Sequence, residues 1–216
     1  MIGHHRRRMF EDRDEAAALL AEELAPRVDG DATVLGIPRG GVVVAAVVAR
    51  ALGAPLDVVI PRKLGAPGNP ELAIGAVAPG VRVVHERTVR QLGISEAYVD
   101  AEADRQGREI ERREAAYRGG RAPASVAGRI AIVVDDGVAT GATAVAALRW
   151  ARAADATRVV FAAPVGPPAA RARLEPEADD VVLLLEPGGF LAVGEWYRDF
   201  DQVSDEEVIQ LLRSAG

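Results

Sequence analysis

Five aliphatic runs, separated by helix-like segments, limit the fold of this 216-residue chain more than any other feature. They fall at about residues 33–37, 56–60, 129–134, 157–165 and 180–185. Strands that read as continuous aliphatic runs are buried on both faces, which is typical of parallel sheets covered by helices. The predicted fold is therefore α/β, an open parallel sheet with helices on both faces.

Helices are expected between and around these runs, at residues 12–24, 41–53, 95–117, 141–154, 167–174 and 204–214. Ser95 is placed to cap one helix, and Ser204 with Glu207 forms a capping box on another. A Gly- and Pro-rich stretch at 65–75 is expected to be a loop. Two β-like runs, 72–77 and 81–89, are joined by Pro79 and Gly80 and predict a hairpin. This hairpin interrupts the strand–helix alternation and is a candidate for a mobile cover.

Composition excludes several classes of protein. Cysteine is absent, which excludes disulfides, thiolate metal sites and a cysteine nucleophile, and no apolar run approaches the length of a membrane span. The net charge of −6 argues against general nucleic-acid binding. The basic start of the chain has no apolar segment typical of a secretory signal, so a cytoplasmic location is expected. Arg6, Arg7 and Arg8 are expected in a solvated tail, where His4 and His5 have no metal-binding spacing.

The stretch IVVDDGVATGAT, residues 132–143, carries the clearest chemistry. Asp135 and Asp136 follow the third aliphatic run, and ligands of open α/β sheets bind at the carboxyl ends of strands. The next residues are small or hydroxylic and lead into a helix, whose free N–H groups and positive dipole end attract anions. A carboxylate accepts hydrogen bonds from hydroxyl groups but repels phosphate. A phosphate beside a diol describes a ribose 5-phosphate.

The motif VVDDGVATGAT resembles the signature of the type I phosphoribosyltransferases. The resemblance implies that Asp135 and Asp136 hold the ribose hydroxyls of phosphoribosyl pyrophosphate (PRPP). It also implies one domain over residues 1–216, with a core at about 30–185. A hood would be formed by 9–29 and 186–216, and a lid by 73–117. The implied 5-phosphate loop consists of Val138, Ala139, Thr140, Gly141, Ala142 and Thr143.

PRPP also carries a pyrophosphate, which needs a second anion site. Arg39, Gly40 and Gly41 follow the first aliphatic run, open a helix and match the family's pyrophosphate loop. The second run ends in PRKLG, so Arg62 and Lys63 are expected on the same edge of the sheet. Lys63 is the only lysine among 26 basic residues. Cations there would neutralise the departing pyrophosphate.

The resemblance implies transfer of the 5-phosphoribosyl group from PRPP to a small acceptor. It implies that Mg²⁺ bridges substrate oxygens and could also contact the two acids. It further implies a homodimer. The acceptor site would lie in the hood, where Phe190, Trp196 and Tyr197 could stack on a flat base or simply pack onto the core. Purine-salvage members carry an aspartate where this chain has Ala139, which counts against a 6-oxopurine acceptor. His85 could be an acid or base on the lid, or a solvent-facing histidine. A PRPP-sensing regulator and a PRPP lyase or hydrolase remain alternatives to the transferase.

Overall fold

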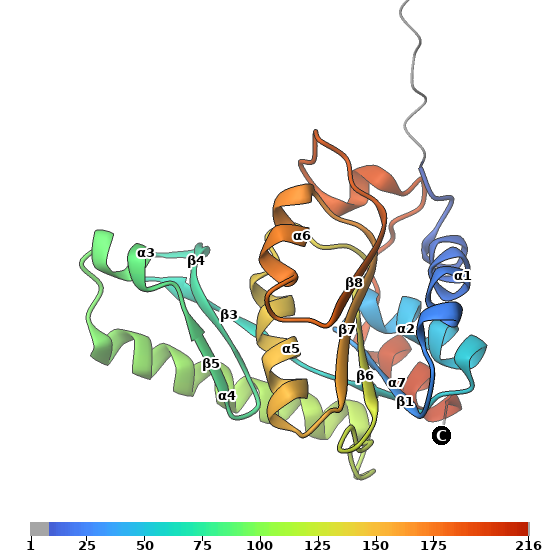
Figure 1. The fold of residues 1–216 in the computed structure, drawn as a ribbon. Coiled ribbons are helices and arrows are strands. Elements are labelled where there is room, and N and C mark those ends of the chain that lie inside the picture. Colours follow the sequence, from blue (N-terminus) through green and yellow to red (C-terminus); the bar gives the residue numbers. More distant parts are fainter. Residues whose placement is uncertain (1–8, 216) are drawn as a thin grey trace, which may run out of the picture.

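The computed structural model describes residues 9–215 and contains a five-stranded parallel sheet with the order β2-β1-β6-β7-β8 (Figure 1). All four strand pairs are parallel, and β1 pairs with both β2 and β6. This arrangement confirms the predicted sheet. Its strands are β1 (Ala32–Gly36), β2 (Leu56–Val58), β6 (Ile130–Val134), β7 (Arg158–Val165) and β8 (Asp180–Leu185).

Helices cover both faces of this sheet, as the sequence predicts. Helices α1 (Arg13–Leu24), α2 (Gly40–Leu52) and α7 (Asp205–Ser214) lie on one face, and α5 (Ala142–Ala153) and α6 (Pro168–Leu174) on the other (Figure 1). Successive residues of one strand point to opposite faces. Thus Ile132 packs with the first group of helices and Val133 with the second. Every residue of β1 and β6 is buried, so the sheet forms the centre of the core.

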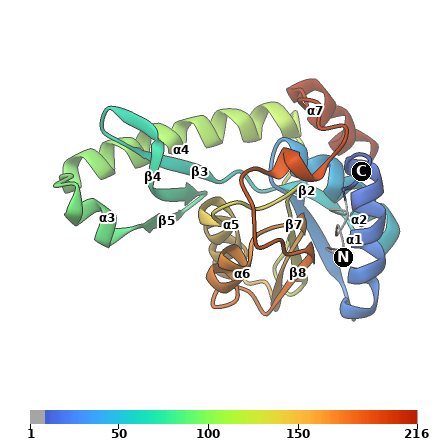
Figure 2. The same cartoon turned by 90° about the horizontal axis from the view of Figure 1, so that it is seen from above.

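A second, antiparallel sheet forms a lobe that extends from the core beyond α5 (Figures 1 and 2). It consists of β3 (Arg62–Ala66), β4 (Asn69–Ala78) and β5 (Val81–Val84), with α3 (Glu86–Gln91) and α4 (Glu96–Arg118). The hairpin joined by Pro79 and Gly80 is confirmed. Two details of the prediction are wrong: most of the supposed loop at 65–75 is paired as β3 and β4, and the second β-like run ends at Val84, where a helix follows.

The end of α4 is fastened to the core by a buried ion pair. Arg118 Nε donates to both carboxylate oxygens of Asp57 on β2, at 3.1 and 3.2 Å. Asp57 is 4% exposed and also accepts hydrogen bonds from the backbone N–H groups of Val58 and Ala124. The lobe is therefore fixed to the parallel sheet where the long helix ends.

The start of the described chain contacts the segment around Tyr197, and both belong to the predicted hood. Phe10 forms a bridge with Tyr197; its N–H donates to the Trp196 carbonyl at 2.8 Å, and its carbonyl accepts from the Arg198 N–H. A short 3-10 helix, η2 (Val193–Trp196), completes the C-terminal part. The predicted caps Ser95 and Ser204, the latter in a capping box with Glu207, are confirmed. The arginine cluster at 6–8 and the two histidines before it lie outside the described residues. In residues 9–215 no helix is long and apolar enough to cross a membrane.

Candidate active site

Asp135 and Asp136 lie at the carboxyl end of β6, as the sequence predicts. The Asp135 N–H donates to the carbonyl of Ala162 on β7 at 3.1 Å, and the Val138 N–H donates to the Val165 carbonyl at 2.9 Å. The neighbouring strand thus holds the loop at two points. The Asp136 N–H donates to Asp135 Oδ1 at 2.9 Å, which sets the relation of the two acids to each other.

The loop after the acids ends at the start of α5. Gly141 caps this helix with a φ of +77°, a conformation that favours glycine, and no side-chain hydrogen bond caps the first turn. The helix therefore begins with N–H groups that are free to bind an anion. Ala139 and Thr140 are exposed, whereas Val138 is buried. The predicted phosphate loop thus has an accessible surface.

The start of α2 contacts the acid pair. A Cβ added at Gly40 would lie 1.8 Å from Asp136 Oδ2, and one at Gly41 would lie 2.8 Å from the Asp135 Cα. This helix also begins without a side-chain cap, and the peptide bond between Pro38 and Arg39 is cis. The structure therefore brings the predicted pyrophosphate loop and the two acids together.

Burial strongly affects the protonation of the two acids. The pKa of Asp135 is raised well above its usual value, first by burial and then by the neighbouring charge of Asp136. Burial also raises the pKa of Asp136, but the nearby Arg13 guanidinium opposes this shift. The two carboxyl groups are adjacent in sequence, but their electrostatic surroundings differ because Arg13 forms an ion pair with Asp136.

The contacts of Arg13 and Tyr197 with the acid pair were not predicted. Arg13 Nε donates to Asp136 Oδ2 at 2.9 Å, and the Tyr197 hydroxyl donates to the Asp136 carbonyl at 2.5 Å. One sequence signal pointed to Arg13: a basic residue in the first turn of a helix opposes the helix dipole. The hood is therefore in direct contact with the predicted site.

The predicted cations fall in two places. Arg62 and Lys63 do not end β2, as predicted, but begin β3, because the core strand stops at Val58. They line a cavity of about 360 Å³ together with Thr143 from the phosphate loop. Burial lowers the pKa of Arg62, and the charge of a second arginine on α4 adds to this shift. Glu71 and Glu102 line the same cavity, so its lining carries both signs of charge.

Arg39, the remaining predicted cation, faces α7. Its Nη1 lies 3.8 Å from Oδ1 of Asp205, which also accepts a 2.6 Å hydrogen bond from the Tyr117 hydroxyl. Asp205 therefore links the predicted pyrophosphate loop to the ends of α4 and α7.

The family described as "Phosphoribosyl transferase domain" matches residues 12–198, which include the sheet, both helix starts and most of the hood. The chain belongs to the phosphoribosyl transferase family. Its relatives include two Mycobacterium tuberculosis proteins, "Putative phosphoribosyl transferase MT0597" of strain CDC 1551 / Oshkosh and "Putative phosphoribosyl transferase Rv0571c" of strain ATCC 25618 / H37Rv. Both are 48% identical over 209 residues, which cover 96% of this chain and 47% of each relative. The chain thus spans about half the length of these relatives.

Solved structures show the same fold for this phosphoribosyl transferase domain. The protein TT1426 from Thermus thermophilus is 47% identical and superposes with a TM-score of 0.83, covering 96% of this chain and 99% of that one. A purine phosphoribosyltransferase from Pyrococcus horikoshii Ot3 is 17% identical with a TM-score of 0.50, covering 89% of this chain and 92% of that one. The second likeness concerns the fold alone.

The aromatic residues of the predicted hood are mostly buried. Trp196 and Tyr197 are only 5% and 3% exposed and pack with Phe10, whereas Phe190 is partly exposed at the edge of the same cluster. Their burial matches the packing alternative for the first two residues; stacking on an acceptor stays a prediction. His85 precedes α3 in the lobe, at the end of the hairpin.

Proposed function

We propose that the protein transfers the 5-phosphoribosyl group from PRPP to a small nucleophilic acceptor, such as a nucleobase, and releases pyrophosphate. One observation carries the proposal: a partly buried acid pair lies between the uncapped start of α2 and the loop that leads to the uncapped start of α5. Two anion-binding helix starts beside two hydroxyl-binding carboxylates match the groups of PRPP in type and number.

Each part of the site would bind one part of the substrate. The carboxylates of Asp135 and Asp136 would accept hydrogen bonds from the ribose hydroxyls. The N–H groups of residues 139–143 would bind the 5-phosphate, since the N–H of Val138 already donates to the Val165 carbonyl. The start of α2 at Gly40 and Gly41 would bind pyrophosphate, because no side chain caps the first N–H groups of this helix. Arg39, Arg62 and Lys63 would screen its charge.

The reaction breaks the bond between the anomeric carbon and the pyrophosphate oxygen and forms a bond from that carbon to the acceptor, which loses a proton. Positive charge develops on the sugar, and negative charge develops on the leaving pyrophosphate. The ionised Asp136 would stabilise the first charge and the predicted cations the second. The protein otherwise acts by positioning its substrates and by excluding water from the reacting carbon.

Magnesium would enter this site as a substrate-bound ion. Among residues 9–215, no group of three or more histidine, aspartate or glutamate side chains is arranged to hold a metal. Mg²⁺ prefers oxygen ligands and often takes most of them from substrate phosphates and water. When bound, it would neutralise charge on the pyrophosphate, and Asp135 and Asp136 are the candidates to contact it.

Calorimetric titration with PRPP and Mg²⁺ tests the proposal. The protein should bind PRPP, and Asp136→Asn should weaken binding roughly 10- to 100-fold, as expected for the loss of a hydrogen bond to a charged group. Asp104→Asn is the matched control, because Asp104 is exposed on α4, away from the acid pair. Absence of binding to the wild type, or equal binding by Asp136→Asn, would contradict the proposal. Pyrophosphate release in the presence of individual nucleobases and small amines would then identify the acceptor.

A further inference from the structure

We infer that Gln106, buried on α4, is a positioning residue that holds Nε of Arg62 and leaves the two terminal amino groups of that guanidinium free to bind a phosphate group of PRPP. This inference rests on the proposed function and deepens it. Gln106 itself would contact no substrate atom. The long helix of the lobe would thereby take part in binding PRPP through an arginine on β3.

Two buried polar side chains lie one turn apart on the face of α4 that contacts β3. Glu102 is 5% exposed and Gln106 is 8% exposed. Burying a polar group costs free energy unless the group is hydrogen-bonded. Apolar residues at these positions would pack the helix on the sheet without that cost. The presence of a polar pair must therefore be explained by the groups it contacts.

A chain of hydrogen bonds runs from Arg62 through Gln106 to Glu102. Arg62 Nε donates to Gln106 Oε1 at 2.8 Å, and Gln106 Nε2 donates to Glu102 Oε1 at 2.8 Å. A guanidinium can only donate and a carboxylate can only accept, so these two partners fix the orientation of the amide. Arg105 holds Glu102 in turn, because its Nε and Nη2 each donate to a carboxylate oxygen at 2.8 Å. The amide is thus a fixed support for the inner edge of the Arg62 guanidinium.

The contact with Gln106 leaves the outer edge of the guanidinium available. Among the described residues, Nη1 and Nη2 of Arg62 donate no hydrogen bond, and no carboxylate forms an ion pair with them. A neutral amide also leaves the positive charge of Arg62 in place, whereas a carboxylate partner would neutralise it. The two terminal amino groups of an arginine match two oxygens of a phosphate group in spacing and direction.

The cavity beside Arg62 reaches the predicted phosphate loop. Arg62 and Thr143, from the first turn of α5, line the same cavity of about 360 Å³. Two carboxylates also line it, but Glu102 is already bound by Arg105, and Glu71 is exposed, so solvent screens its charge. A phosphate group at the start of α5 would therefore lie within the space that the free edge of Arg62 faces.

The docking of α4 on β3 has support that is independent of Gln106. The Tyr98 hydroxyl donates to the Gly65 carbonyl of β3 at 3.0 Å. Ile110, on the same helix, is 2% exposed and packs in the core. Removal of the Gln106 amide should therefore release Arg62 while the helix stays in place.

The test compares Gln106→Met, Arg62→Met and the double variant. Methionine is close to glutamine in length but has no amide to accept from Arg62. By calorimetry with Mg²⁺, Gln106→Met should weaken PRPP binding about tenfold, and Arg62→Met should weaken it about tenfold or more. In the Arg62→Met background, Gln106→Met should change the affinity by about twofold or less, because it acts through Arg62.

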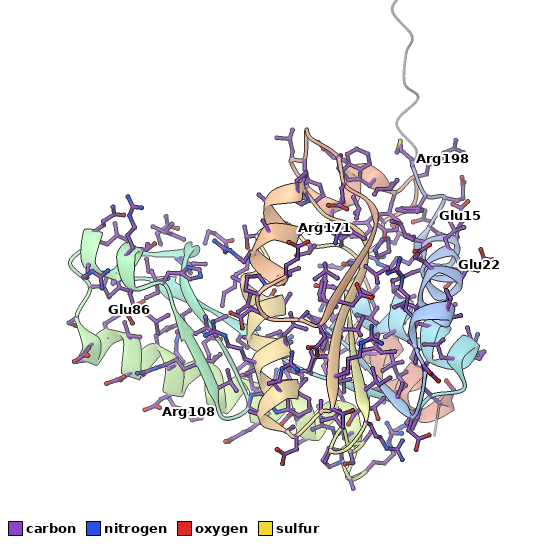
Figure 3. The ribbon with its side chains drawn as sticks, viewed as in Figure 1. Glu15, Glu22, Glu86, Arg108, Arg171 and Arg198 are labelled. Carbon is purple, nitrogen blue, oxygen red and sulfur yellow. The ribbon has the colours of Figure 1, made fainter. Side chains whose placement is uncertain are left out.

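Two control variants separate positioning from packing. Tyr98→Phe removes the other hydrogen bond between α4 and β3, and Arg108→Met removes an arginine that is exposed on α4 and points away from the antiparallel sheet (Figure 3). Both should bind PRPP within about twofold of the wild type, since neither changes Arg62. Urea unfolding of each variant verifies that the fold is kept.

A measurement on the ligand-free protein tests the contact itself. In ¹⁵N–¹H NMR, the Nε–H of Arg62 should exchange with water at least about tenfold faster in Gln106→Met than in the wild type, and at the wild-type rate in Tyr98→Phe. Arg62→Met identifies the signal by its loss.

Four results would each overturn the inference. They are an unchanged exchange rate in Gln106→Met, unchanged PRPP affinity in Gln106→Met or in Arg62→Met, an equal effect of Gln106→Met with and without Arg62, and a similar loss of affinity in Tyr98→Phe. Absence of PRPP binding to the wild type would instead contradict the proposed function.

Discussion

At Gly40, the lack of a side chain lets Asp136 lie directly against the start of α2. A Cβ at this position would be 1.8 Å from Oδ2 of Asp136, well inside van der Waals contact. Asp135 approaches the next residue, Gly41, in the same way. The two glycines therefore allow the acids and the helix start to share one small space.

Gly40→Ala should weaken PRPP binding by about tenfold or more, because either Asp136 or the start of α2 must move and small displacements in such sites have large effects. Gly107→Ala is the matched control. Gly107 lies inside α4 with open space around it, so the alanine should raise the free energy of unfolding by about 0.5–1 kcal/mol and leave binding unchanged. Calorimetry and urea unfolding measure the two effects. Unchanged binding by Gly40→Ala would show that the contact is unimportant.

Asp135→Asn should stabilise the folded protein at neutral pH. Burial and the Asp136 charge raise the pKa of Asp135 in the folded state. The stability linked to its proton is therefore fully present below the pKa of the unfolded state, about 3.9. It is lost as the pH rises through the pKa of the folded state. An asparagine stays neutral and can still accept from the Asp136 N–H. We expect a gain of about 0.5–2 kcal/mol at pH 8, the usual range for a single stabilising substitution.

Urea unfolding of Asp135→Asn at pH 8 and pH 4 measures this dependence. The gain should shrink at pH 4, where the wild-type carboxyl is also protonated. A gain of equal size at both values would show that the carboxyl charge is not its cause.

Sequence analysis located the site residues that lie close together within one short motif. Asp135 and Asp136 precede a helix start within one short motif, so their place at the sheet edge followed from strand order. Arg13 lies 123 residues from Asp136, and only the packing of α1 brings the two together. Trp196 and Tyr197 were recognised as an aromatic cluster, but sequence could not decide between exposure and burial.

Among the elements, α4 depends on the buried pair formed by Arg118 and Asp57. Their side chains are 11% and 6% exposed, and the pair joins the end of the helix to β2. Removing one partner of a buried pair leaves the other charge without compensation.

Arg118→Met should therefore lower the free energy of unfolding by about 3–5 kcal/mol. Arg112→Met is the matched control, since Arg112 pairs with Glu109 on the same helix but its side chain is 63% exposed. Its urea midpoint should stay close to that of the wild type. Similar midpoints for the two variants would mean that the pair does not fasten the lobe.

The element boundaries that sequence analysis missed cluster in this lobe. Residues 65–75 are rich in glycine and proline, yet they pair in a hairpin with register shifts around Gly65. A bulged strand that contains breakers carries no alternation for a sequence pattern to detect. In the parallel sheet the clear error is the end of β2, which stops at Val58 before the predicted Arg62 and Lys63.

The whole molecule divides into a parallel-sheet body and the antiparallel lobe (Figure 2). The residues of β1 and β6 are all buried, whereas only one residue of α3 is buried. Segments with few buried apolar contacts open at lower free energy.

Hydrogen exchange should therefore be at least about tenfold faster in β5 and α3 than in β1 and β6, and the difference should follow the pattern of burial. Mass spectrometry of peptides from the ligand-free protein measures it. Equal protection of both regions would contradict a lobe that opens separately, and with it the predicted mobile cover.

The hood has a consequence for how the protein is made. Arg13 reaches the Asp201 carbonyl, and Phe10 pairs with the segment around Tyr197, so two segments far apart in the chain close over one carboxylate. During translation the parallel sheet can assemble while this enclosure is still incomplete, because the segment around Tyr197 leaves the ribosome after the last strand of the sheet. A chain cut short between the two would keep Arg13 beside Asp136 but would lack the Tyr197 and Asp201 contacts and the core residues of α7, so Asp136 would be enclosed only in the intact domain.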